Sequence, residues 1–152
     1  TCTSCHSPFD NNNLAQVPAG QLDLSATAAN DEPAHLTSYR ELFFNDAEQE
    51  VIEGILVDKR IEQRDENGNI VYQRDENDEL ILDNEDNPIA VLVTVPVRAA
   101  LSTNGAQASD KFFTLFNGGS HQGQLSKHEL KLISEWLDIG GQYYNTPFYQ
   151  EN

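Results

Sequence analysis

Two cysteines and a histidine near the start of the chain have types and a spacing that allow chemistry. They are Cys2, Cys5 and His6, in the segment TCTSCH. Cysteines three positions apart on one turn present both sulfurs to the same side, where they can add to the two vinyl groups of a haem. The next residue then lies beneath the iron. The motif therefore predicts one covalent haem c, with His6 as an iron ligand.

Two other interpretations of these thiols remain open. A redox-active dithiol or disulfide of the thioredoxin type is expected beside a βαβ pattern, and no such pattern surrounds Cys2 and Cys5. A structural zinc or iron–sulfur site generally uses four ligands, and the chain has no further cysteine. Zinc would need Cys2, Cys5, His6 and one more histidine, so haem is the interpretation that the motif favours.

The second iron ligand is expected to be a histidine, because the sequence contains no methionine. His128 lies off the apolar stripe of a predicted helix, as a solvent-facing residue does. His35 lies in a polar loop, where a surface or capping role is the simpler explanation. His121 lies in GGSHQGQLS, whose glycines let the backbone approach a flat cofactor closely. We predict His121 as the second ligand, with His35, His128 or an open iron as alternatives.

The elements that must position these residues begin with a long loop. Residues 7–34 are rich in Asn, Pro, Gly and Ala and carry few signals of regular structure. The segment TSYRELFF follows, and it predicts a short helix with Ser38 as the N-cap and Glu41 as its partner three residues on. The first part of the chain is therefore expected to be mostly loop with one helix.

The segment LSKHELKLISEWLDIGG predicts a helix with clear boundaries. Ser126 and Glu129 have the spacing of a capping box, and Gly140 and Gly141 supply the left-handed end. Trp136 lies within the helix on a broad apolar face, where we expect it to line the core or the haem.

Residues 51–97 have a different texture, with β-rich runs separated by the turn clusters DENGN, RDEND and NEDNP. This pattern predicts an inserted antiparallel hairpin or meander, and RDENGNIVYQ and RDENDELILD suggest a doubled unit. Asp65, Asn67 and Asn69 alternate like the start of a calcium loop. Glu76 reaches position twelve of such a loop only if Asp65 is first, and the glycine then comes too early. A hairpin turn is the better interpretation.

Length and charge limit what the whole chain can be. A chain of 152 residues suits one domain, residues 1–152. The net charge of −16, from 25 acidic and 9 basic residues, argues against nucleic acid and anionic lipid and favours a redox partner with a basic surface. No apolar run approaches the roughly 18 residues that span a bilayer, so no membrane insertion is expected. Only Thr1 precedes Cys2, as expected of a mature or excised module.

The chain also resembles the class I cytochromes c, through the attachment motif near the N-terminus, the late ligand loop and the terminal helix with its aromatic residue. In that family the distal methionine precedes the last helix by a few residues, and His121 occupies the matching position. A carbonyl from a proline-containing loop orients the proximal histidine there, which implies a role for Pro18 in VPAG. The family's helix before the motif has no counterpart in the printed sequence, in which Thr1 directly precedes Cys2. The resemblance implies a mainly α, cytochrome c-like helical core around one haem, with the β insertion at about 51–97.

More narrowly, CTSCH, QLDLS, LTSYRELFF and LKLISEWLDIGGQYYN look like the mono-haem cytochrome domains of modular secreted proteins in marine polysaccharide-degrading bacteria. Those domains accompany carbohydrate-binding modules. The resemblance implies a periplasmic or extracellular electron carrier, not an enzyme, that feeds oxidative polysaccharide degradation. The alternative is a haem sensor or peroxidase-like protein with an open or displaceable distal site. Two histidine ligands and an acidic surface both favour ferric iron, so we expect a reduction potential below that of Met/His relatives.

Overall fold

The computed structural model describes residues 2–144, and within this range the protein is a mixed α and β structure. Three α-helices are present in this part of the chain: α1 (Thr37–Phe43), α2 (Asp110–Phe116) and α3 (Lys127–Asp138). The structure is 25% helical and 21% strand. The prediction of a mainly α fold is therefore wrong. Two of the helices have only seven residues, and the strands contribute almost as much regular structure as the helices do.

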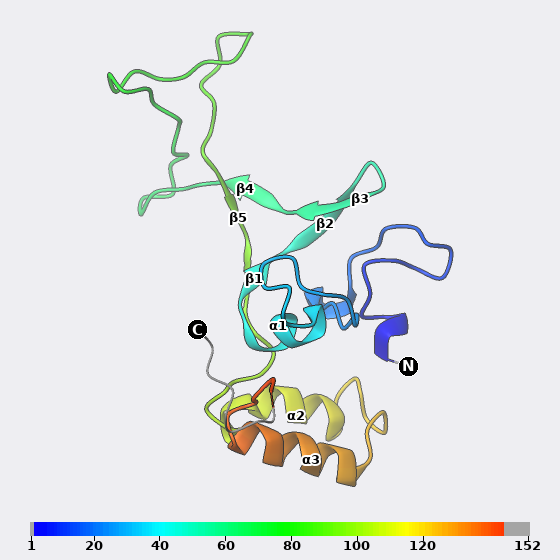
Figure 1. The fold of residues 1–152 in the computed structure, drawn as a ribbon. Helices are drawn as coiled ribbons and strands as arrows, with labels where there is room; N and C mark the ends of the chain where they lie inside the picture. The colour runs from blue at the N-terminus through cyan, green and yellow to red at the C-terminus, as the bar shows by residue number, and fades with distance from the viewer. Residues whose placement is uncertain (1, 145–152) are drawn as a thin grey trace.

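The helices form two levels beneath a set of strands (Figure 1). Helices α2 and α3 lie side by side at the bottom, and α1 lies above them together with the loops of the N-terminal segment. Three short 3-10 helices complete this part: η1 (Cys2–Ser4), η2 (Ala19–Gln21) and η3 (Ala106–Ser109). No described helix is long and apolar enough to cross a membrane.

Helix α3 has the boundaries that the sequence predicts. The Ser126 side chain accepts from the backbone of Glu129, and the Glu129 side chain accepts from the backbone of Ser126, which completes the capping box. At the other end, Gly140 and Gly141 have positive φ and donate to the carbonyls of Leu137 and Trp136. This pair of bonds is a Schellman motif, and both predicted ends are confirmed.

Helix α1 lies where it was predicted, but its cap does not. Its N-cap is Leu36, which makes no side-chain cap bond, and Ser38 lies inside the helix. The Thr37 hydroxyl instead bonds to the Thr27 hydroxyl at 3.0 Å. Contacts between the helix start and the preceding loop replace the capping box, and this leaves Glu41 available for another role.

The strands are short and pair in twos, all antiparallel. Their bounds are β1 (Asp46–Ala47), β2 (Gln49–Ile52), β3 (Ile55–Asp58), β4 (Arg60–Glu62), β5 (Leu92–Thr94) and β6 (Pro96–Val97). Strand β2 pairs with its neighbour β3, whereas β1 pairs with β6 and β4 with β5. The antiparallel pairing is confirmed, but a meander is wrong, because two of these sheets join the two ends of the insertion.

The strands branch at three-way junctions, and each junction is closed by a ring of three backbone hydrogen bonds. At the first, Glu48 donates to Val95, Val95 to Lys59 and Lys59 to Glu48, over 2.7–3.3 Å. Two further rings join residues 63, 71 and 91 and residues 73, 81 and 89. The rings pair backbone groups where a sheet divides, and such groups would otherwise need water or another partner. We call residues 49–94, which lie between the ring members Glu48 and Val95 in the chain, the hairpin arm.

Three tips of the arm are copies of one turn, at residues 65–69, 75–79 and 83–87, whereas the β2–β3 hairpin turns at Glu53 and Gly54. In each, an Asp Oδ1 accepts from the backbone N–H groups two and four residues on, and the fourth residue has positive φ. These bonds are internal to the turn, which confirms hairpin turns at the acidic clusters. The third turn falls at the predicted NEDNP cluster, and the structure shows that it has the same bonds as the other two.

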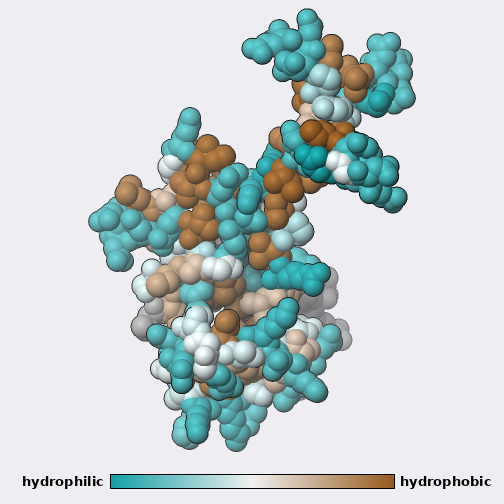
Figure 2. Space-filling model, turned by 180° about the vertical axis from the view of Figure 1, so that it is seen from behind, coloured by the Kyte–Doolittle hydropathy of each residue, from teal (hydrophilic) through white to brown (hydrophobic). Residues whose placement is uncertain are grey.

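The core lies beneath the arm and is small. Among the described residues the buried apolar side chains include Leu137, Leu101 and Ala29, and Pro18 is also fully buried. Apolar side chains of the arm are largely exposed, among them Ile55 at 64% and Leu92 at 53%. Figure 2 shows hydrophobic side chains along the strands and hydrophilic side chains at the tips. The arm is therefore a projection with little interior of its own.

Candidate haem-binding cleft

The first turn of the chain sets the direction of His6. The N–H groups of Cys5 and His6 both bond to the Cys2 carbonyl, at 3.2 and 3.0 Å, and this closes a turn that carries both thiols. Both cysteines are exposed and free. The His6 carbonyl accepts from Leu24 and the Cys5 carbonyl from Ala19, each at 2.9 Å, which holds the turn against the following loop.

His121 lies in the loop between α2 and α3. Its N–H donates to the Leu115 carbonyl at 2.9 Å, and its Nδ1 lies 2.9 Å from the Ser120 hydroxyl. The ring also lies 5.5 Å from the ring of Phe116. Gly119 allows this close return, because a Cβ there would lie 2.7 Å from the Leu115 Cα.

The structure brings the rings of His6 and His121 together across a cleft. Their centroids are 5.8 Å apart and the planes are inclined by 34°. A metal ion about 2 Å from one nitrogen of each ring would place the centroids roughly 6 Å apart, so the observed spacing fits an ion held between them. The cleft has a volume of about 360 Å³ and is lined by His6, Ala19, Gly20, Gln21, Leu22, Glu41, Phe44, Asp46, Val97, Arg98, Ala100, Leu115, Ser120 and His121.

His6 is oriented by a backbone carbonyl, but not by one in the VPAG stretch. Its Nδ1 lies 3.2 Å from the carbonyl oxygen of Leu22. Pro18 is four residues earlier, is fully buried, and its carbonyl accepts from Gln21 at 2.9 Å. The carbonyl contact expected from the resemblance is present, and Pro18 contributes to the shape of the loop that delivers it.

The other two histidines lie away from the cleft. His128 is exposed in the first turn of α3. His35 lies among three tyrosines, with ring centroids 5.1 Å from Tyr39, 4.5 Å from Tyr143 and 6.1 Å from Tyr144. His121 is therefore the histidine that the fold places opposite His6.

Trp136 does not line the cleft either. Its ring packs 5.1 Å from Phe43 and 6.4 Å from Tyr39, and its Nε1 donates to the Gln142 carbonyl at 2.9 Å. Trp136 therefore joins α3 to α1, in the core role that the sequence allowed for it.

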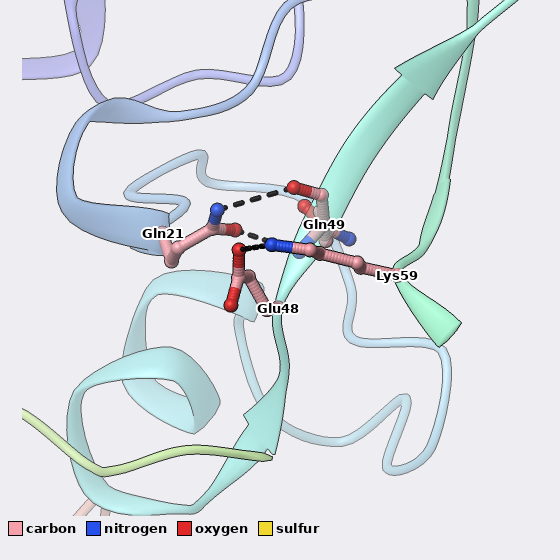
Figure 3. A network of polar contacts seen from close by, with 4 residues as sticks. All are labelled: Gln21, Glu48, Gln49 and Lys59. Atoms are coloured by element: carbon pink, nitrogen blue, oxygen red, sulfur yellow. Dashed lines mark hydrogen bonds and ion pairs between the residues drawn. The ribbon is translucent and has the colours of Figure 1, made fainter. Parts of the chain in front are cut away.

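Gln21 joins the cleft to the base of the hairpin arm (Figure 3). Its side-chain amide forms two hydrogen bonds with the backbone of Gln49, accepting at 2.8 Å and donating at 3.1 Å. Beside it, the Lys59 ammonium lies 2.5 Å from the Glu48 carboxylate. The Gln21 amide bonds to the Gln49 backbone as a neighbouring strand would, and it fixes the loop that contains Gln21 to the arm. No sequence pattern indicates this contact.

Glu41 is a residue of the cleft that the sequence interpretation did not assign to the site. It lines the cleft, and its Oε2 accepts from the Asp23 N–H at 3.3 Å. Burial, reinforced by a hydrogen bond with the Asp46 carboxyl, raises the pKa of Glu41 to about 8. The pattern placed this residue as the capping partner of Ser38, and only the three-dimensional neighbourhood reveals the acidic pair.

The competing metal interpretations find no support in the geometry. Within residues 2–144, no three His, Cys, Asp or Glu side chains converge as metal ligands, either at the thiols or at the acidic turns. A hollow of about 450 Å³ in the arm, lined by Ile61, Glu62, Gln63, Arg64 and Val93, also lacks histidine and cysteine. The cleft between His6 and His121 is the best candidate site.

Comparisons with models of protein families, with curated proteins and with solved structures find no match for this chain. The site must therefore be interpreted from its own geometry.

Proposed function

We propose that the protein is an electron-transfer c-type cytochrome. Cys2 and Cys5 would bind one haem c covalently, and His6 and His121 would hold its iron. The observation that carries the proposal is the pair of imidazole rings 5.8 Å apart across a cleft, with two free thiols on the turn that bears His6. The haem would supply one-electron chemistry, and the chain supplies its ligands and their orientation.

The contacts of the two rings support stable coordination. The Leu22 carbonyl can only accept, so the Nδ1 of His6 carries hydrogen and Nε2 keeps its lone pair for the metal. Ser120 holds the ring of His121 through its Nδ1, and when that nitrogen is the donor, Nε2 of His121 is also free for the metal. Because both ligands are held by the chain, a change of iron charge needs little rearrangement.

The location and partner of the carrier are also part of the proposal. The resemblance to secreted cytochrome domains favours a periplasmic or extracellular protein that feeds oxidative polysaccharide degradation beside carbohydrate-binding modules. The net charge of −16 favours a redox partner with a basic surface. Association with that partner should slow as salt is added, and a rate independent of ionic strength would contradict this assignment.

Covalent attachment is tested by counting thiols in protein produced with a c-type cytochrome maturation system. We expect the purified chain to retain haem after denaturation and to have no thiol available for alkylation. The Cys2→Ser, Cys5→Ser double variant should lose the covalent haem. Two alkylatable thiols in the wild-type chain, without bound haem, would overturn the proposal. A covalent haem that binds carbon monoxide at rest would favour the alternative, a sensor or peroxidase-like protein.

A further inference from the structure

A single peptide group connects Glu41 to His6. The carbonyl oxygen of Leu22 lies 3.2 Å from His6 Nδ1, and the N–H of the next residue, Asp23, donates to Glu41 Oε2 at 3.3 Å. That carbonyl and that N–H belong to the same planar, resonance-stabilised amide. Hydrogen bonds in such a chain polarise one another, so a change of charge on Glu41 is felt at the ring of His6.

The groups around Glu41 determine the pH at which its carboxyl becomes negatively charged. Asp46 of β1 shares a hydrogen bond with the carboxyl, and Asp23 of the loop lies close by. Arg98, after β6, lines the same cleft and is the one arginine or lysine among its described lining residues. Arg40, on the same helix as Glu41, is bonded to Asp31 and stacks on Phe44.

The two acids nearest Glu41 resist a further negative charge. Burial comes first and the Asp46 carboxyl second among the causes that raise the pKa of Glu41 to about 8. At neutral pH the carboxyl is therefore mostly protonated. It loses its proton in mildly alkaline solution.

We propose that Glu41 is a positioning residue for His6, and that loss of a proton from the Glu41 and Asp46 pair lowers the reduction potential of the site through the Leu22–Asp23 peptide. The inference rests on the proposed function. An ionised Glu41 accepts a stronger hydrogen bond from the Asp23 N–H. This polarises the peptide group and makes the Leu22 carbonyl oxygen more negative, which strengthens the hydrogen bond from His6 Nδ1. A more strongly donating imidazole and an added negative charge both favour the oxidised state.

Reduction of the site adds one electron and at most one proton. When an electron from a one-electron donor enters the site, the positive charge there falls by one, and the carboxyl pair binds a proton more tightly. Between the pKa of the carboxyl pair in the oxidised form and its higher pKa in the reduced form, that proton is taken from water. No bond of the chain is formed or broken.

The test is a potentiometric titration of the haem-loaded protein from pH 5 to pH 10. We expect a constant potential at low pH and then a fall, in which the equilibrium constant for reduction decreases by up to tenfold per pH unit, or about 59 mV. Glu41→Gln should hold the low-pH value throughout this range. Glu135→Gln, which removes an exposed carboxylate from α3, should keep the wild-type profile and so controls for net charge.

Two further measurements keep the inference falsifiable. Asp46→Asn should move the midpoint of the fall to lower pH, and this variant replaces Glu41→Gln if that protein does not fold. The proton NMR signal of His6 Nδ1–H should titrate with the potential in the wild type and not in Glu41→Gln. A purely structural role of Glu41 would leave that signal independent of pH.

Failure of the inference differs from failure of the proposed function. A low-spin haem protein whose potential has the same pH profile in the wild type and in Glu41→Gln would overturn the inference alone, and would assign the profile to the haem propionates. A chain without covalent haem, or with a high-spin iron at rest, would overturn the assignment of its ligands first.

Discussion

The cleft region and the hairpin arm are built in opposite ways. In the cleft, side chains from distant segments converge: His6 from the first turn, Glu41 from α1 and His121 from the loop after α2. In the arm, backbone bonds define the structure, and the side chains mostly face solvent. The cleft should therefore be sensitive to single side chains, whereas the arm should tolerate changes that leave its turns and rings intact.

The largest contrast is expected from one added methyl group placed in each region. Gly119→Ala puts a Cβ 2.7 Å from the Leu115 Cα and must displace the loop of His121. The strain should cost about 1–3 kcal/mol and should weaken or remove the low-spin optical spectrum. The measurement is the spectrum of the oxidised protein together with urea unfolding.

Gly68→Ala is the matched change in the arm. Its Cβ would meet nothing within 4 Å, although the φ of +84° disfavours alanine by about 1 kcal/mol. The haem spectrum should stay as in the wild type. A spectral loss in this variant, or an unchanged spectrum in Gly119→Ala, would break the comparison between the regions.

The next effect concerns the pH dependence of stability. The pKa of Glu41 is raised to about 8 in the folded chain, well above the usual value for a glutamate. The native state therefore holds a proton that the unfolded state releases between about pH 4.5 and 8, and the free energy of unfolding falls as pH rises through this range. The slope is at most about 1.4 kcal/mol per pH unit, less after screening, because the carboxyl is partly exposed.

Urea unfolding of the wild type and of Glu41→Gln at pH 5 and pH 8 measures this term. The difference between the two pH values should be smaller in the variant. An equal loss of stability in both proteins would mean that Glu41 does not hold its proton in the folded chain.

A smaller effect is expected where the two regions are joined. Gln21→Ala removes both side-chain hydrogen bonds to the Gln49 backbone, at a cost of about 1–2 kcal/mol. Hydrogen exchange should become faster at Gln49 and at the first junction. Gln73→Ala, inside the arm, is the control that should leave the exchange near the cleft unchanged. Equal exchange at the base of the arm in the wild type and in Gln21→Ala would show that this contact does not couple the regions.

The smallest effect is expected at a turn tip. The Asp75 carboxylate accepts hydrogen bonds from the backbone N–H groups of Glu79 and Asn77. These bonds, chiefly the one from Glu79, hold the pKa of the carboxyl below its usual value. Asp75→Ala should speed hydrogen exchange within residues 75–79 only, whereas Asp75→Asn keeps an accepting oxygen and should change it less. Faster exchange throughout the arm would mean that the turns support one another.

Local rules explain which parts of the molecule could be predicted from the sequence. The ends of α3 and the acidic hairpin turns depend on neighbouring residues, and the structure confirms both. The approach of His121 to His6 was expected from the glycines around His121 and from its place before the last helix. These features carry their signals within a few positions of the chain.

The features that were missed depend on contacts between distant segments. The Leu22 carbonyl that meets His6 and the Asp23 N–H that meets Glu41 are backbone groups, which leave no mark on residue type. The rings of three backbone bonds at the junctions are equally independent of side chains. For the same reason the sequence pattern predicts a meander and a mainly α fold, and it does not indicate the strands that join both ends of the insertion.

Low-temperature EPR of the oxidised protein tests the central claim most directly, with the wild type measured beside His121→Ala and His128→Ala. The account predicts a low-spin signal of two imidazole ligands in the wild type and in His128→Ala, and its replacement by a high-spin signal in His121→Ala. The wild-type signal in His121→Ala, or a high-spin wild type, would contradict the assignment of His121 as the partner of His6.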